Sequence, residues 1–169
     1  MARRSISNVQ SHAAGNHNFD SCDFRQRTLI LKKRFQYQPA PRKIVLHKIN
    51  VAEKFSKISD YYKPHIAGEL NGQMVKLVKA NTEFVWHHHD REDEMFLVVK
   101  GRFRMDFKDA DAREHQEWIE TGEFIIVPRG VEHRPVAEEE CWIMLFEPAS
   151  TLNTGNVINE RTQPHLERV

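Results

Sequence analysis

The 169-residue sequence predicts an all-β fold, an antiparallel jelly-roll barrel with a short N-terminal helix and a disordered basic leader. Strand-like segments follow one another at short intervals from residue 65, turn residues separate them, and one segment alternates strictly between apolar and polar side chains. The length suits one domain with a substantial core and is too short for two such barrels. We therefore expect a leader at 1–43, a barrel domain at 44–148 and a C-terminal tail at 149–169 that packs on or near the barrel.

The leader differs from the rest of the chain in charge and pattern. Residues 1–43 carry nine Lys or Arg against two acids, whereas residues 44–169 carry sixteen against twenty-two. The leader also lacks periodic apolar spacing, so we expect it to be disordered. It is consistent with an organelle transit peptide or with an extension that has no function. An arm for nucleic acid is disfavoured because no aromatic residues are interleaved with the basic ones.

Cysteine content and hydropathy indicate the compartment. Cys22 and Cys141 form neither a CxxC motif nor a disulfide framework, which favours a reducing compartment. The longest apolar runs are far too short to cross a bilayer. We expect a soluble cytoplasmic protein without a membrane partner; an organelle is the alternative if the leader is a transit peptide.

The first elements are a short helix and a hairpin. Asn50 is a suitable N-cap and is followed by apolar residues at helical spacing, which predicts a helix over residues 51–60. The dipeptide Asn71-Gly72 lies between two strand-like segments, residues 65–70 and 73–80. This dipeptide is the strongest short-range signal for a β-hairpin.

The remaining elements are all strands. Residues 94–100 and 102–109 flank Gly101, and the second segment places Phe103, Met105 and Phe107 on one face and polar residues on the other. That alternation predicts one interior face and one solvated face. Four further strand-like segments complete the barrel: 114–120, 122–128, 132–138 and 140–148.

A pattern of metal-ligand residues lies within residues 86–101, WHHHDREDEMFLVVKG. Side chains alternate between the faces of a strand, so His87 and His89 point to one side while His88 points to the other. Glu94 opens the next apolar run, where an antiparallel neighbour can bring its carboxylate back towards the imidazoles. The same loop offers two alternative carboxylates, Glu92 and Asp93.

A second pattern lies in residues 122–133, GEFIIVPRGVEH, and ends in His133. Its turn residues, Gly122, Pro128 and Gly130, set the ends of strands. Together the two patterns resemble the signature motifs of the cupin superfamily. The first motif, G-x5-H-x-H-x4-E-x6-G, is matched from its first histidine onward, and the second, G-x5-P-x-G-x2-H, is matched throughout.

The resemblance is strongest over residues 65–148, and TLNTGN at 151–156 is similar to the tail of small single-domain cupins. Two positions depart from the family pattern and are not ligands: Asn81 replaces a glycine, and Ala137 replaces an asparagine. The resemblance favours Glu94 over its two neighbours, and it implies a homodimer. The implied metal centre consists of three histidines and one glutamate: His87, His89, Glu94 and His133.

Imidazole and carboxylate donors without thiolates suit a divalent transition metal, either Fe, Mn, Zn, Ni or Co. We expect six apolar side chains to line the pocket: Phe103, Met105, Phe107, Phe124, Trp142 and Met144. Such a cavity suits a small organic molecule that chelates the metal through oxygen atoms. The sequence is consistent with an iron-dependent oxygenase, a metal-dependent isomerase or lyase, or a non-catalytic metal-dependent sensor or binding module. It identifies no catalytic residue beyond the ligands.

Overall fold

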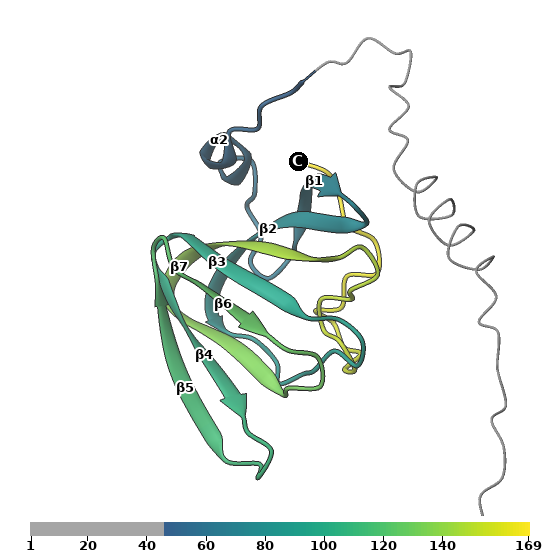
Figure 1. The fold of residues 1–169 in the computed structure, drawn as a ribbon. Coiled ribbons are helices and arrows are strands. Elements are labelled where there is room, and N and C mark those ends of the chain that lie inside the picture. The colour runs from purple at the N-terminus through teal and green to yellow at the C-terminus, as the bar shows by residue number, and fades with distance from the viewer. Residues whose placement is uncertain (1–45) are drawn as a thin grey trace, which may run out of the picture. The chain divides into compact units, whose positions relative to one another are not determined.

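The computed structural model describes residues 46–169, which form one helix and seven strands (Figure 1). The leader predicted at residues 1–43 lies outside the described residues. The elements in chain order are α2 (Val51–Phe55), β1 (His65–Leu70), β2 (Gln73–Glu83), β3 (Glu94–Lys100), β4 (Arg102–Lys108), β5 (Glu114–Glu120), β6 (Phe124–Val127) and β7 (His133–Pro148). The all-β barrel with a short preceding helix is therefore confirmed. No helix in residues 46–169 is long and apolar enough to span a membrane.

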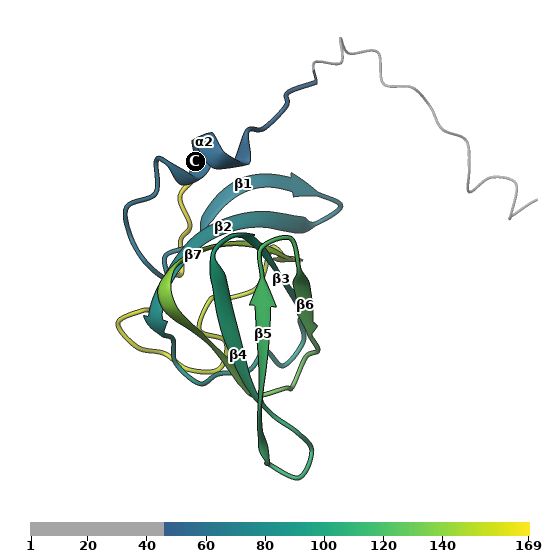
Figure 2. The same ribbon diagram turned by 90° about the vertical axis from the view of Figure 1, so that its left-hand side faces the viewer.

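The seven strands form one antiparallel sheet that curls into a barrel (Figure 2). Its interior is a core of buried, mainly apolar side chains. The main order is β1-β2-β7-β3-β6, and β4 pairs with both β5 and β7. Strand β7 holds the sheet together because its C-terminal half lies between β2 and β3 while its N-terminal half pairs with β4. Residues from distant parts of the chain therefore meet along β7.

The prediction of two separate strands at 132–138 and 140–148 was wrong, because these residues form the single 16-residue strand β7. The acidic run Glu138–Glu140 lies inside this strand. The register with β2 shifts at this point, where Ala80 pairs with Cys141 and Thr82 pairs with Ala137. This irregularity accommodates the acidic residues at the surface, and the strand continues through them.

The helix is shorter than predicted, since α2 ends at Phe55. Asn50 caps it as expected: its side-chain oxygen accepts a hydrogen bond of 3.1 Å from the backbone N–H of Glu53. The buried Phe55 stacks on Trp142 of β7, with ring centroids 4.8 Å apart. Helix α2 therefore covers the outer face of β2 and β7, and the barrel encloses a second, larger core.

The first hairpin forms where the sequence predicted it. Asn71 and Gly72 both have positive φ angles, 53° and 79°, which the turn between β1 and β2 requires. Strand β2 then runs three residues beyond the predicted end at residue 80, to Glu83. The extension carries the chain directly to the first histidine pattern.

Candidate metal centre

His87 and His133 are brought together by the backbone. They form an antiparallel bridge in which the His87 N–H donates to the His133 carbonyl at 3.0 Å and the His133 N–H donates to the His87 carbonyl at 2.9 Å. Their rings lie 4.3 Å apart, between centroids. Paired residues of an antiparallel ladder share a face, so both imidazoles point into the barrel.

His89 and Glu94 complete a buried cluster. Glu94 is the first residue of β3, and its Oε2 lies 3.3 Å from His89 Nε2 and 3.4 Å from His133 Nε2. One ligand atom from each of His87, His89, Glu94 and His133 lies within 4.8 Å of the others, and all four residues are buried. The structure thus brings together the four residues that the sequence indicated.

The hydrogen bonds of two histidines leave their inner nitrogens free. His87 Nδ1 lies 2.9 Å from the carbonyl oxygen of Val85, and His133 Nδ1 lies 2.9 Å from that of Val131. A carbonyl oxygen can only accept, so each Nδ1 carries the proton and each Nε2 keeps a lone pair. A histidine that binds a metal usually donates its other ring N–H in this way.

Three polar atoms of the cluster have no hydrogen-bond partner although they are buried: His89 Nε2, His133 Nε2 and Glu94 Oε2. Buried polar atoms without partners are uncommon and costly in folded proteins. A cation among the four side chains would satisfy all three at once, and imidazole nitrogen with carboxylate oxygen is a typical donor set for first-row divalent metals. The residues present therefore fit a divalent ion.

The protonation states also suit cation binding. Burial, together with the neighbouring His133, lowers the pKa of His87 to about 4, so its imidazole is neutral at pH 7. Burial alone would raise the pKa of Glu94, but the close approach of His133 and His89 to its carboxylate outweighs burial and holds this pKa well below its ordinary value. Glu94 is therefore a carboxylate.

The other polar residues of the first pattern lie elsewhere. His88 points away from the cluster, and its Nε2 lies 3.1 Å from the Asp90 carboxylate. Asp93 is exposed and accepts hydrogen bonds from the backbone and guanidinium of Arg129. Glu92 accepts a hydrogen bond from Ser150. None of these three groups belongs to the cluster.

A small cavity of about 40 Å³ reaches the cluster from inside the barrel. His87 and Glu94 form part of its wall, and the rest is almost entirely apolar or aromatic: Tyr62, Pro64, Val78, Phe84, Phe96, Pro135, Ile143, Leu145 and Asn153. A water molecule needs about 10–15 Å³ of such space, so the cavity as it stands holds only a few small groups. No lysine or arginine of residues 46–169 lines it.

The predicted pocket lining needs correction, because none of its six residues lines this cavity. Trp142 and Met144 lie on the outer face of β7 and pack beside Phe55, and Phe124 is 59% exposed. Phe103 is buried in the core, whereas Met105 and Phe107 line a separate apolar hollow between β4 and β6.

The error in β7 has a simple cause. The run CWIMLF is apolar on both faces, so alternation alone does not tell which face is inside. The position of His133 identifies the inner face of β7, because the strand is continuous and the residues two, eight, ten and twelve positions after His133 are all buried. Counting by two along the strand from His133 places Ile143 and Leu145 inside.

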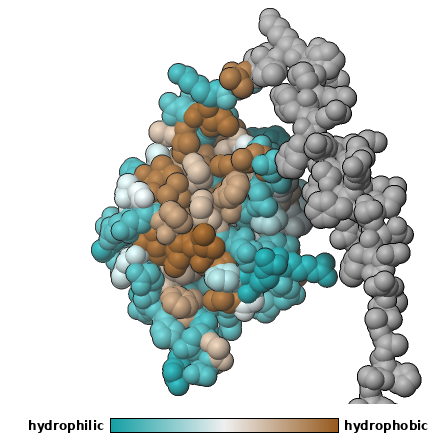
Figure 3. All heavy atoms as spheres, in the orientation of Figure 1, coloured by the Kyte–Doolittle hydropathy of each residue, from teal (hydrophilic) through white to brown (hydrophobic). Residues whose placement is uncertain are grey.

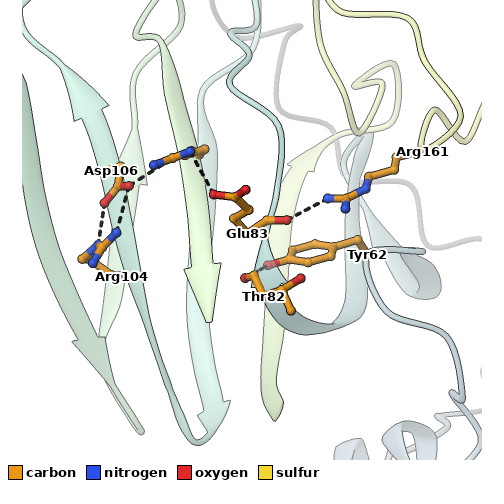
Figure 4. A network of polar contacts seen from close by, with 7 residues as sticks. Tyr62, Thr82, Glu83, Arg104, Asp106 and Arg161 are labelled. Carbon is orange, nitrogen blue, oxygen red and sulfur yellow. Dashed lines mark hydrogen bonds and ion pairs between the residues drawn. The ribbon is translucent and has the colours of Figure 1, made fainter. Parts of the chain in front are cut away.

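Tyr62 lines the cavity, although no spacing in the sequence places it there. Its ring stacks on Phe84 with centroids 4.8 Å apart, and Phe84 in turn meets the edge of His87. The Tyr62 hydroxyl donates to the Thr82 carbonyl at 2.8 Å, while Arg161 from the tail lies over the Tyr62 ring and donates to the Glu83 carbonyl (Figure 4). The aromatic chain thus connects the cluster to the end of β2.

Comparison with known proteins supports the fold and the pattern. Residues 74–145 match the family profile described as the Cupin domain. The structure of a cupin-2 domain containing protein from Shewanella frigidimarina is 41% identical, with a TM-score of 0.55, and the match covers 59% of this chain and 93% of the other. Protein NMB1881 from Neisseria meningitidis is 32% identical with a TM-score of 0.52, and the match covers 61% of this chain and all of the other.

A curated relative matches over a shorter stretch. YdbB from Bacillus subtilis is 33% identical over 66 residues, which correspond to 39% of this chain and 55% of YdbB. The aligned stretch thus spans about half the length of that relative. The residues that match the family profile, 74–145, lie within the part of the chain that forms the barrel.

Proposed function

The chain belongs to the cupin family, and from this premise we propose that His87, His89, Glu94 and His133 bind a divalent transition-metal ion at which a small organic molecule is held. The observation that carries the proposal is the set of three buried, unpartnered donor atoms within one cluster of four side chains. Fe, Mn, Zn, Ni and Co all suit these donors. When bound, the ion would supply a Lewis acid for an oxygen donor of the small molecule.

The cavity defines the class of molecule. Its wall is almost entirely apolar and offers no cationic side chain from residues 46–169 to a phosphate group, which disfavours sugar phosphates. The aromatic rings of Tyr62, Phe84 and Phe96 suit a planar or apolar body. We therefore propose a compact, largely apolar ligand whose oxygen atoms reach the metal.

A non-catalytic binding or sensing role is the second candidate. The cavity wall holds no free acid or base beyond the proposed ligands, because the Tyr62 hydroxyl is occupied by the Thr82 carbonyl. Binding at the metal needs no such group, whereas isomerase or lyase chemistry needs one to move a proton. Incubating metal-loaded protein with catechol and with acetylacetone distinguishes the two candidates: product formation supports an enzyme, and recovery of the unchanged molecule from the complex supports a binding module.

Metal content after mutation tests the site itself. We expect wild-type protein purified with added Co²⁺ or Zn²⁺ to retain about one ion per chain and His87→Ala and His133→Ala proteins to lose most of it, because each ligand contributes strongly to affinity. His88→Ala is the matched control, since His88 is adjacent in sequence and points outward. Elemental analysis that finds equal metal in all four proteins contradicts the proposal.

We also propose that the protein is a homodimer. Apolar side chains gather on the outer face of β7, β3 and β6 (Figure 3). Cross-strand pairs place Met95 beside Ile126 and Leu97 beside Phe124, and both residues of β6 are more than half exposed. A second copy can bury this face through a two-fold axis, because such an axis sets the same apolar patch against itself.

A further inference from the structure

A lysine and a glutamate are fully buried inside the barrel, close to the candidate metal centre. Lys76 Nζ lies 2.8 Å from Glu147 Oε1, and both side chains are 1% exposed. Lys76 Nζ also donates to the backbone carbonyl of Thr151 at 3.1 Å. Lysine and glutamate are among the residues least often fully buried, so this pair needs an explanation.

The strand register places Glu147 beside Glu94. Met95 of β3 pairs with Phe146 of β7, so the next residues, Glu94 and Glu147, are neighbours on the inner face. Burial, together with the Glu94 carboxylate, raises the pKa of Glu147. Lys76, Glu147 and the Glu94 carboxylate of the cluster are therefore successive neighbours on the inner face of the barrel.

This arrangement restricts the position of the Glu94 carboxylate. Glu94 Oε2 faces His89 and His133, and its neighbour in the strand register, Glu147, is paired with Lys76. Glu147 Oε2 is buried and has no hydrogen-bond partner among the described residues. A buried pair is a poor source of stability but can specify geometry.

We propose that Lys76 and Glu147 are positioning residues that hold the Glu94 carboxylate towards the histidines and thereby set the affinity and geometry of the metal centre. This inference rests on the proposed metal-binding function. Residues behind a metal ligand that orient it by hydrogen bonds typically account for about 10–100-fold in metal affinity.

Two single substitutions distinguish the effect of the position of the Glu147 carboxyl group from the effect of its charge. Glu147→Asp keeps the charge but withdraws the carboxyl group by one methylene, away from Glu94. Glu147→Gln keeps the length: its amide oxygen can accept from Lys76 and its amide nitrogen can donate to Glu94. We expect Co²⁺ affinity to fall about 10–100-fold for Glu147→Asp, with a changed visible Co²⁺ spectrum, while Glu147→Gln stays close to wild type.

A double substitution distinguishes the positioning role of the Lys76–Glu147 pair from any contribution of the pair to protein stability. Lys76→Met with Glu147→Leu replaces the buried pair by apolar groups, which proteins often tolerate. We expect this protein to fold but to bind Co²⁺ about 10–100-fold more weakly.

Asp106→Asn is the control. Asp106 is also buried and is paired with two arginines, Arg104 and Arg134, but it lies on the face of β4 that points away from the barrel interior (Figure 4). Its Co²⁺ affinity and spectrum should match those of wild type.

The outcomes distinguish this inference from the function on which it rests. A wild-type protein that binds no Co²⁺ overturns the metal centre itself. Wild-type binding with unchanged affinity and spectrum in Glu147→Asp overturns the positioning role alone, as does a Glu147→Gln protein that loses affinity as strongly as Glu147→Asp. If the double variant does not fold, the two single substitutions still decide the question.

Discussion

His87 illustrates how burial prepares a single residue for metal binding. Its Nδ1 proton is held by the Val85 carbonyl, and its pKa is lowered to about 4 by burial and the nearby His133. Protons therefore do not compete for its free nitrogen at neutral pH. The same shift makes the metal-free protein sensitive to acid.

The sign of this pH dependence follows from the direction of the shift. The unfolded chain takes up a proton at His87 near pH 6.5, whereas the folded protein does so only near pH 4. The contribution to stability is thus complete above about pH 6.5 and is lost as the pH falls towards 4. We expect the free energy of unfolding of metal-free protein to fall from pH 7 to 4.5 by about 2–3 kcal/mol more in wild type than in His87→Gln.

Urea unfolding of the two metal-free proteins at both pH values measures this difference. Comparison with His87→Gln removes the contributions of Glu94, Glu147 and the other titrating groups that the two proteins share. Equal losses of stability in both proteins would contradict a buried, neutral His87.

At the scale of elements, the C-terminal segment TLNTGN, residues 151–156, is hydrogen-bonded to the backbone of the segment that carries His87, His88 and His89. The Asn156 N–H donates to the His88 carbonyl at 3.1 Å, and the Asn156 side-chain oxygen accepts from the His88 N–H at 2.9 Å. Gly155 lies so close that a Cβ atom would stand 2.1 Å from the His88 carbonyl oxygen. The TLNTGN segment therefore packs directly behind His87 and His89.

This contact predicts that Gly155→Ala disturbs the metal centre from outside it. Gly72→Ala is the matched control, since Gly72 also has a positive φ, has no atom near its would-be Cβ and lies in the turn between β1 and β2. Backbone strain should cost about 1–2 kcal/mol in both proteins, and the clash should add about 1–3 kcal/mol in Gly155→Ala. Thermal unfolding and Co²⁺ titration check this: Gly155→Ala should lose affinity as well as stability, and equal behaviour of the two variants would exclude the proposed support.

The barrel and the ligand cluster could be predicted from the sequence because their signals are local or unambiguous. Alternation separates His87 and His89 from His88, and turn residues mark the hairpin at Asn71-Gly72. The pocket could not be predicted, because β7 is apolar on both faces in its C-terminal half. The sequence also gives no sign that Glu147 meets Lys76 and Glu94, since that contact depends on the register of three strands.

At the scale of the whole barrel, the outer surface has two contrasting faces. On β4 and β5, Arg102 and Arg104 lie over the ring of Trp118, and the nearby acids pair with them. Such a charged, internally paired face is compatible with solvent. The outer face of β3 and β6 carries Phe124 and Ile126 instead, without comparable charge pairs among the described residues, and a second copy that covers it would remove large apolar side chains from water.

A double substitution on β6 tests the homodimer. Phe124→Glu with Ile126→Lys places charges on the apolar face, where burial against a second copy would desolvate them, so we expect this protein to be monomeric. Light scattering during size exclusion should give twice the 19.9 kDa chain mass for wild type and the single chain mass for the variant.

Ile158→Glu controls for removal of an exposed isoleucine elsewhere, since Ile158 is 75% exposed and lies in the tail. Because Phe124 and Ile126 point away from the cluster, the monomer should keep its metal; a monomeric wild type, or a variant that remains dimeric, would rule out this face as the interface.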